Sequence, residues 1–249
     1  MKQFTWPDNR RCAVSLTYDD ALECHYETVA PQFESAGLRA TFNLTIARGN
    51  AMENPEPWKK LAEAGHELAN HTLFHPCWFA KETGKWLDSA YNLRDYTAER
   101  FKDEVRVGNW ILGQIDGKKE RTYGNTCHNN YIGDGDKKIC LETILPEFFI
   151  AARGEHTGKP VQPADSNLYN LGTIGGDRKT CAQFQEEIEA CGQSGGWLIY
   201  TIHGVGKGTH GGFVDTSEHE KLLNWLGENK ETIWTAPMIE VARYIRNQQ

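Results

Sequence analysis

Two adjacent carboxylates, Asp19 and Asp20, come directly after a short apolar stretch at residues 13–17. Two negative charges at the edge of a core are destabilising by on the order of several kcal/mol unless a cation or a shared proton compensates them. A metal ion bound by one carboxylate removes that penalty and leaves the other able to take up a proton. The pair therefore predicts a metal site with a base beside it.

Histidines supply partners for the aspartate pair. His71 and His75 are four residues apart, which puts both imidazoles on one face of a helical turn, a spacing typical of metal ligands. His203 follows an apolar stretch at residues 197–202. All three groups come after predicted strands, and in parallel α/β folds the carboxyl ends of the strands gather functional side chains. We therefore expect them in one site.

The elements that position these groups alternate along the chain. Apolar runs predict strands at residues 13–17, 39–46, 67–70, 121–123, 148–152, 197–202 and 233–235. Helical spacing predicts helices at residues 22–37, 58–64, 97–114, 139–145, 183–191, 217–228 and 237–247. Residues 76–95 and 154–178 are expected to be mostly loop. This alternation predicts an α/β fold of parallel strands joined by right-handed crossovers, and no linker or repeat divides it.

Composition narrows the function classes. The 249 residues include 27 basic and 34 acidic side chains, a net charge of −7, and no run of Lys and Arg. Nucleic acid and anionic membranes are therefore not expected as partners. No stretch approaches the roughly 20 apolar residues that span a bilayer. The polar residues 1–11 lack the pattern of a signal peptide.

The seven cysteines are odd in number and contain no Cys-x-x-Cys pair. This spacing fits neither a disulfide framework nor a structural zinc site, so most are expected to be small core residues in a reducing compartment. A cytoplasmic location is predicted, and a secreted form whose signal has been removed is the alternative.

The motifs named above resemble those of the polysaccharide deacetylase family (NodB homology, carbohydrate esterase family 4). Thr-Tyr-Asp-Asp-Ala at residues 17–21 resembles the first family motif, and residues 71–75 resemble the second, His-Ser/Thr-x-x-His. The apolar strand ending at His203 resembles the last motif. The resemblance covers nearly the whole chain and implies one catalytic domain over residues 1–249, a distorted (β/α) barrel with about seven strands.

The resemblance also implies roles. It makes Asp20, His71 and His75 the ligands of a divalent metal, Asp19 the general base and His203 the general acid. Zn²⁺ is the expected ion, and Co²⁺, Ni²⁺ and Fe²⁺ accept similar ligands. The implied substrate is an N-acetylated or O-acetylated sugar or oligosaccharide. Two alternatives stay open: hydrolysis of C–N bonds in small cyclic amides or ureides at the same site, and a non-catalytic carbohydrate-binding relative.

The third family motif, Arg-x-Pro-Pro-Tyr/Phe-Gly, is matched only at Tyr123 and Gly124. The family's arginine orients the base, and Arg153 is preferred over Arg121 for this role because it follows a predicted buried strand. The remaining expected contacts with substrate are Asp177, from the fourth motif, and Trp78, by stacking on sugar; Tyr123 and Gly124 complete this set.

Other polar and aromatic residues receive simpler expectations. The glycine-rich residues 204–212 fail the P-loop pattern and are expected to be a flexible loop after the acid histidine. Further expectations are a loop position for Trp86, core positions for Trp110 and Trp197, solvent exposure for His210 and His219, and surface or core roles for His128 and His156.

Overall fold

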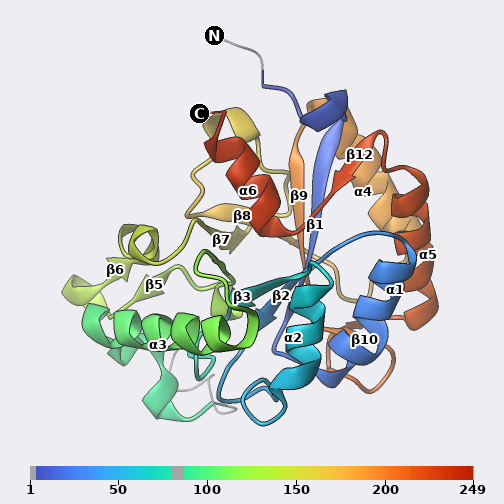
Figure 1. Ribbon diagram of the computed structural model, residues 1–249. Coiled ribbons are helices and arrows are strands. Elements are labelled where there is room, and N and C mark those ends of the chain that lie inside the picture. The colour runs from blue at the N-terminus through green and yellow to red at the C-terminus, as the bar shows by residue number, and fades with distance from the viewer. Residues whose placement is uncertain (1–3, 80–86, 249) are drawn as a thin grey trace.

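Strand β1 (Cys12–Asp19) is buried along its whole length, and the main sheet forms around it. The computed structural model describes residues 4–79 and 87–248. From β1 the parallel strands run in the order β2 (Thr41–Leu44), β3 (Glu67–Asn70), β4 (Thr122–Tyr123), β7 (Ala151–His156), β8 (Leu171–Gly175) and β9 (Trp197–Ile202). Because β9 pairs back to β1, the sheet closes into a barrel (Figure 1). The predicted distorted (β/α) barrel with about seven strands is confirmed.

Strand β12 (Ile233–Thr235) pairs with β1 outside the closed barrel. Residues 12–14 of β1 pair with β12, whereas residues 17–19 pair with β2. One edge of β1 therefore changes partner part-way along the strand. This split distorts the barrel and brings the carboxyl end of β1 next to the ends of β2 and β3.

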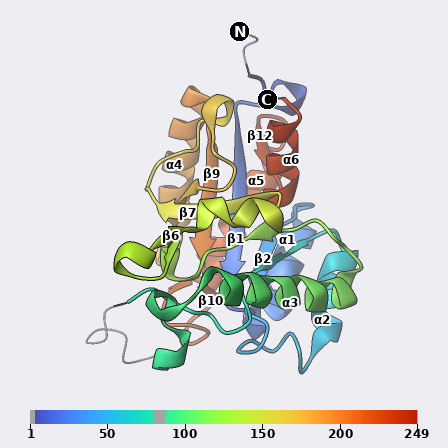
Figure 2. The same ribbon diagram turned by 90° about the vertical axis from the view of Figure 1, so that its left-hand side faces the viewer.

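Helices surround the barrel (Figures 1 and 2). In chain order they are α1 (Ala30–Ser35), α2 (Pro55–Glu63), α3 (Ala98–Asp116), α4 (Cys181–Ser194), α5 (Thr216–Glu228) and α6 (Met238–Arg246). The apolar sides of α4 and α5, with Phe184 and Leu222 as examples, are fully buried in one core cluster with side chains of β1. Burying one such side chain stabilises the fold by about 1.5–3 kcal/mol.

The ends of α3 follow from local chemistry. The Thr97 hydroxyl accepts a hydrogen bond from the backbone N–H of Arg100, and the helix ends at Gly117, whose φ is 70°. Helix α4 begins with a capping box between Thr180 and Gln183. Side-chain caps satisfy N–H groups that have no partner within the helix, and glycine adopts a positive φ without strain.

Three predicted segments differ in the structure. Residues 154–178, expected to be mostly loop, contain β8 and the end of β7. The glycines of β8 interrupt the sequence pattern from which a strand is predicted. They are needed because the chain packs too closely for a side chain there: a Cβ on Gly172 would lie 2.5 Å from the hydroxyl of Thr157. Residues 139–145 form a short strand and 3₁₀ turns instead of a helix, and the predicted helix at residues 22–37 starts late, with a π-helical turn at His25–Val29.

Two small pairs of strands lie outside the barrel. β5 (Tyr131–Ile132) pairs with β6 (Ile139–Cys140), and β10 (Gly204–Val205) pairs with β11 (Phe213–Val214). The second pair folds the glycine-rich segment back toward the end of β9, because the N–H of Gly204 donates to the carbonyl of Gly212.

Cys77 and Cys127 form a disulfide, so the expectation of no disulfide is wrong for this pair. Their separation of 50 residues carries no sequence signal, but they follow the neighbouring strands β3 and β4. Disulfides are typical of oxidising compartments, which removes the cysteine argument for a cytoplasmic location. The other cysteines are free thiols: Cys12, Cys24, Cys140, Cys181 and Cys191. Among the described helices, none is long and apolar enough to cross a bilayer.

Candidate metal and acid–base site

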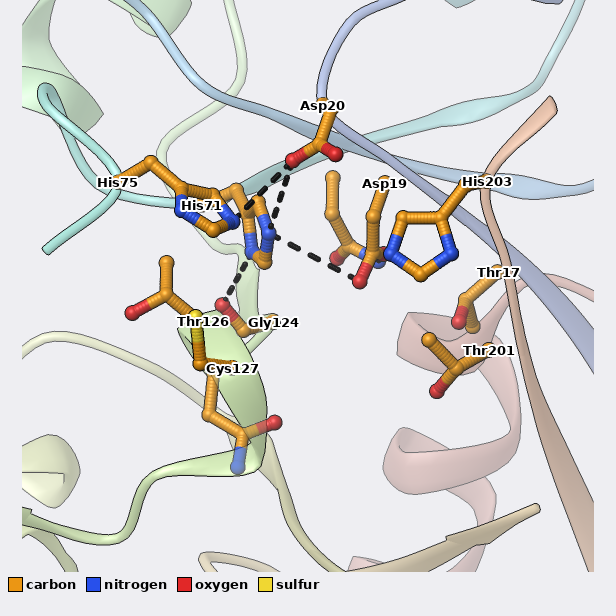
Figure 3. A network of polar contacts seen from close by, with 12 residues as sticks. Thr17, Asp19, Asp20, His71, His75, Gly124, Thr126, Cys127, Thr201 and His203 are labelled. Atoms are coloured by element: carbon orange, nitrogen blue, oxygen red, sulfur yellow. Dashed lines mark hydrogen bonds and ion pairs between the residues drawn. The ribbon is translucent and has the colours of Figure 1, made fainter. Parts of the chain in front are cut away.

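The carboxyl ends of the barrel strands surround a pocket of about 320 Å³. β1 supplies Asp19 and is followed by Asp20, β3 leads into His71, and β9 leads into His203 (Figure 3). The lining residues are Asp19, Asp20, His71, His75, Asn125, Cys127, His128, His203 and His210. The residues of the three sequence motifs are thus brought together.

One group in this pocket has the composition of a metal site. Asp20 Oδ1 lies 3.6 Å from His71 Nε2 and 3.2 Å from His75 Nε2, and one ligand atom from each residue fits within 4.8 Å of the others. His71 Nδ1–H donates to the carbonyl of Gly124 at 2.6 Å, which leaves the lone pair on Nε2 directed at Asp20. These donors suit a divalent cation such as Zn²⁺.

The backbone bends sharply to present Asp20. Its φ is 82°, and that of the following Ala21 is 54°, both in the left-handed region. Burial alone would raise the pKa of Asp20, but hydrogen bonding and charge from His71 and His75 hold it well below its usual range. The carboxylate is therefore ionised and concentrates negative charge beside two imidazoles.

Asp19 lies deeper in the pocket and is only 4% exposed. The Arg153 guanidinium donates to both its oxygens, with N···O distances of 2.9 and 2.6 Å, and Asn43 donates to one of them at 2.8 Å. Burial raises the pKa of Asp19, but the charges of Arg153 and His71 outweigh it and lower the pKa to about 2. Arg153 thus contacts Asp19 as expected of the orienting arginine, whereas Arg121 pairs with Asp116. The role of Arg153 in catalysis stays a prediction.

His203 faces the same pocket and is held by Asp177. Its Nδ1–H donates to Asp177 Oδ2 at 2.6 Å, and its backbone N–H donates to Asp177 Oδ1 at 3.0 Å. Burial lowers the pKa of His203, but Asp177 and the aspartate pair raise it to about 9. Asp177, expected to contact substrate, is placed to orient His203.

His210 was expected in solvent, but it lines the pocket. Its ring stacks on His203 with centroids 4.6 Å apart, and its Nε2 lies 3.9 Å from Asp20 Oδ2. Glycines fold its loop inward, since a Cβ on Gly212 would lie 2.2 Å from Asp177 Oδ2. The run of glycines directly after His203 was the only sequence signal for this arrangement.

Several other expected residues lie elsewhere. Tyr123 is buried against Phe149, and Trp78 is a half-buried residue that donates from its ring N–H to the carbonyl of Gly133, so neither lines the pocket. Gly124 accepts from His71, and a Cβ there would lie 2.6 Å from Asn43, so it makes room for the residues around Asp19.

The predicted positions of the remaining tryptophan and histidine side chains agree with the structure in some cases and differ in others. Trp197 is buried as expected, whereas Trp110 is 66% exposed because it lies on the outer side of α3. His219 is fully buried and bonds to the Tyr18 hydroxyl, which contradicts the expected exposure. His128 lines the pocket, and its ring centroid lies 5.2 Å from that of His156. Trp86 lies outside the described residues.

The structure is a closed parallel (β/α) barrel with carboxylate and imidazole side chains at the carboxyl ends of its strands. The family model described as polysaccharide deacetylase matches residues 7–127, which include the first two motifs. Residues 7–127 of the chain are thus similar to the polysaccharide deacetylase family.

One curated protein matches most of the chain. A gellan lyase from a Bacillus species is 25% identical over 264 residues, which cover 96% of this chain and 10% of the lyase. The chain thus spans about a tenth of the length of that curated relative.

Solved structures share the fold. A protein from Pseudomonas aeruginosa PAO1 described as a "probable Polysaccharide deacetylase" aligns with a TM-score of 0.64 at 14% identity, over 98% of this chain and 94% of that one. The peptidoglycan deacetylase PdaC from Bacillus subtilis aligns with a TM-score of 0.54 at 12% identity, over 98% and 95%.

Proposed function

We propose that this protein is a metal-dependent hydrolase that removes acetyl groups from N-acetylated sugars or oligosaccharides. The observation that carries the proposal is the convergence of an ionised carboxylate, a protonated imidazole and a three-residue ligand group on one pocket. The similarity of residues 7–127 to the polysaccharide deacetylase family supports the acetylated carbohydrate as the substrate class.

Asp20, His71 and His75 are the residues that would hold the metal. The bond from His71 Nδ1–H to Gly124 fixes the tautomer that a ligand needs, and three protein ligands leave a position open for substrate. Two imidazoles and one carboxylate favour Zn²⁺. A bound divalent cation would polarise an amide carbonyl and make water more acidic.

The other residues then divide the proton transfers. Arg153 and Asn43 fix Asp19 in its ionised form, and Asp19 accepts a proton from the attacking water. His203 is protonated at neutral pH and has its Nδ1 occupied by Asp177, so it donates from Nε2 to the amide nitrogen. This proton converts a poor leaving group into an amine that can depart.

Asp20→Asn tests the proposal. The variant keeps the shape of the side chain but removes the negative charge between His71 and His75. We expect tightly bound Zn²⁺ to be lost and acetate release from N-acetylglucosamine oligomers to fall by more than about 100-fold. Asp165→Asn, which changes an exposed carboxylate outside the pocket, serves as the matched control.

A panel of substrates separates the alternatives. Acetate release that survives in Asp20→Asn with metal removed would overturn the proposed mechanism. Ring opening of cyclic ureides without acetate release from any acetylated sugar would replace the proposed substrate class and keep the site.

A further inference from the structure

The disulfide between Cys77 and Cys127 lies directly beside the candidate metal ligand His75. Cys77 Sγ is 3.7 Å from His75 Nδ1, on the side of the ring opposite the nitrogen that faces Asp20. Cys127 is exposed and lines the pocket, next to Gly124 and Thr126 in Figure 3. A reductant in solution can therefore approach the bridge from the side of Cys127, since Cys77 is buried.

Bonds that do not involve sulfur hold the two cysteine segments together. The Thr126 hydroxyl donates to the carbonyl of Pro76, the residue before Cys77. The backbone N–H of Trp78, the residue after it, donates to Asn129 Oδ1 at 2.6 Å. Cys77 itself is fixed by backbone bonds to residues 91 and 93. Opening the disulfide therefore leaves both sulfur atoms near His75.

We propose that His75, Cys77 and Cys127 form a second metal site that exists only when the disulfide is reduced. One donor atom from each residue lies within 4.8 Å of the other two. Two thiolates and one imidazole are a favoured ligand set for Zn²⁺, and the fourth position stays open. The three donor atoms are thus already close together in the oxidised protein, but the S–S bond prevents the two sulfur atoms from binding a metal as thiolates.

The chemical step is a two-electron reduction of sulfur. A dithiol gives two electrons and two protons to the bridge and is itself oxidised to a disulfide, so two thiols replace one S–S bond. Each thiol releases its proton when it binds the metal, because the thiolate is the ligand.

The two metal sites share one imidazole. His75 faces Asp20 through Nε2 and Cys77 through Nδ1. A neutral imidazole has one lone pair, so a cation on Nδ1 leaves the ring proton on Nε2, which can bind a second cation only after it loses that proton. Reduction would therefore lower the affinity of the Asp20 group for metal; this coupling rests on the proposed function, whereas the thiol site does not.

Cobalt titration of the full chain tests the thiol site. The protein is reduced anaerobically with a phosphine, which becomes a phosphine oxide with oxygen from water, and is then freed of reductant. We expect Co²⁺ to produce a thiolate-to-cobalt charge-transfer band that saturates at about one ion per chain. The oxidised protein should bind Co²⁺ without this band.

Variants decide the assignment. Reduced Asp20→Asn should keep the band, which separates the thiol site from the proposed catalytic centre. The double variant Cys77→Ser, Cys127→Ser should lose it, whereas Cys140→Ser, which removes a thiol outside the cluster, should retain it. A reduced protein without the band, or a band that persists in the double serine variant, overturns the proposal.

Discussion

Arg153 and Asp19 form a buried, two-point ion pair in which the planar guanidinium fixes both carboxylate oxygens. A lysine ammonium in this position keeps the charge but can fix only one point. The orientation of Asp19 therefore depends on the shape of the side chain opposite it as well as on its charge.

Arg153→Lys should lower kcat for acetate release by about 100-fold, because Asp19 loses its fixed orientation toward the attacking water. Steady-state kinetics with N-acetylated oligomers measures the change. Arg121→Lys is the matched control, since it alters another buried arginine–aspartate pair away from the pocket. An equal loss of kcat in both variants would attribute the effect to general destabilisation.

Asp177→Asn should move the alkaline limb of the kcat/KM profile to lower pH. The Asp177 carboxylate helps to raise the pKa of His203 to about 9, and without it the pKa falls toward the ordinary value of about 6.5. Since the acid must be protonated, activity then disappears at a lower pH than in the parent protein. A profile whose alkaline limb does not move would exclude this role for the pair.

Some residues of the pocket could be predicted from the sequence and others could not. Asp19, Asp20, His71 and His75 stand out because they are adjacent or regularly spaced after apolar strands. His210 does not, because its place in the pocket depends on a loop that folds back over Asp177. Tyr123 and Trp78 looked like binding residues by type, but their neighbours in space make them part of the packing.

At the scale of elements, strands β7 and β8 show why some of the barrel escaped prediction. Gly154 and Gly172 interrupt the pattern of a strand, yet both are required by close packing. Strands with branched apolar residues, such as β9, were predicted with their observed bounds, as were β3 and β12. The local sequence pattern therefore predicts strands rich in apolar side chains, and it misses strands in which glycine is needed because a neighbouring segment packs closely against them.

Gly154→Ala should destabilise the protein by about 1–3 kcal/mol, because its Cβ would lie 1.8 Å from Asn170 Oδ1 and 2.8 Å from the backbone carbon of Asn170. Urea denaturation measures the change. Gly211→Ala is the control, since a Cβ there has no heavy atom within 4 Å among the neighbours considered and should change stability by less than about 0.5 kcal/mol. Equal midpoints for the two variants would contradict the packing argument.

At the scale of the whole molecule, closure of the barrel brings His203, which follows β9, beside the candidate metal ligands that follow β1 and β3. The alternation of strands and helices predicted this architecture well, whereas the disulfide between neighbouring loops could not be read from spacing. That residues 1–249 act as one catalytic domain stays a prediction.

Zn²⁺ at about 100 times its dissociation constant should stabilise the oxidised protein by about 2.7 kcal/mol, since the unfolded chain lacks the assembled ligand group. For a chain of this size, the unfolding temperature should rise by roughly 5–10 °C. Calorimetry with and without a chelator measures the shift. Asp20→Asn should show none, and an equal shift in that variant would place the stabilising ion elsewhere.

The pairing of β1 with β9 has a consequence for biosynthesis. Ala13 pairs with Trp197, so roughly 180 residues must be made before this apolar strand meets its partner. At the usual rate of translation, that delay is roughly 10–40 s. During that time the strand has exposed edges, and the nascent chain depends on early contacts with β2 and α1, or on chaperones, to avoid aggregation.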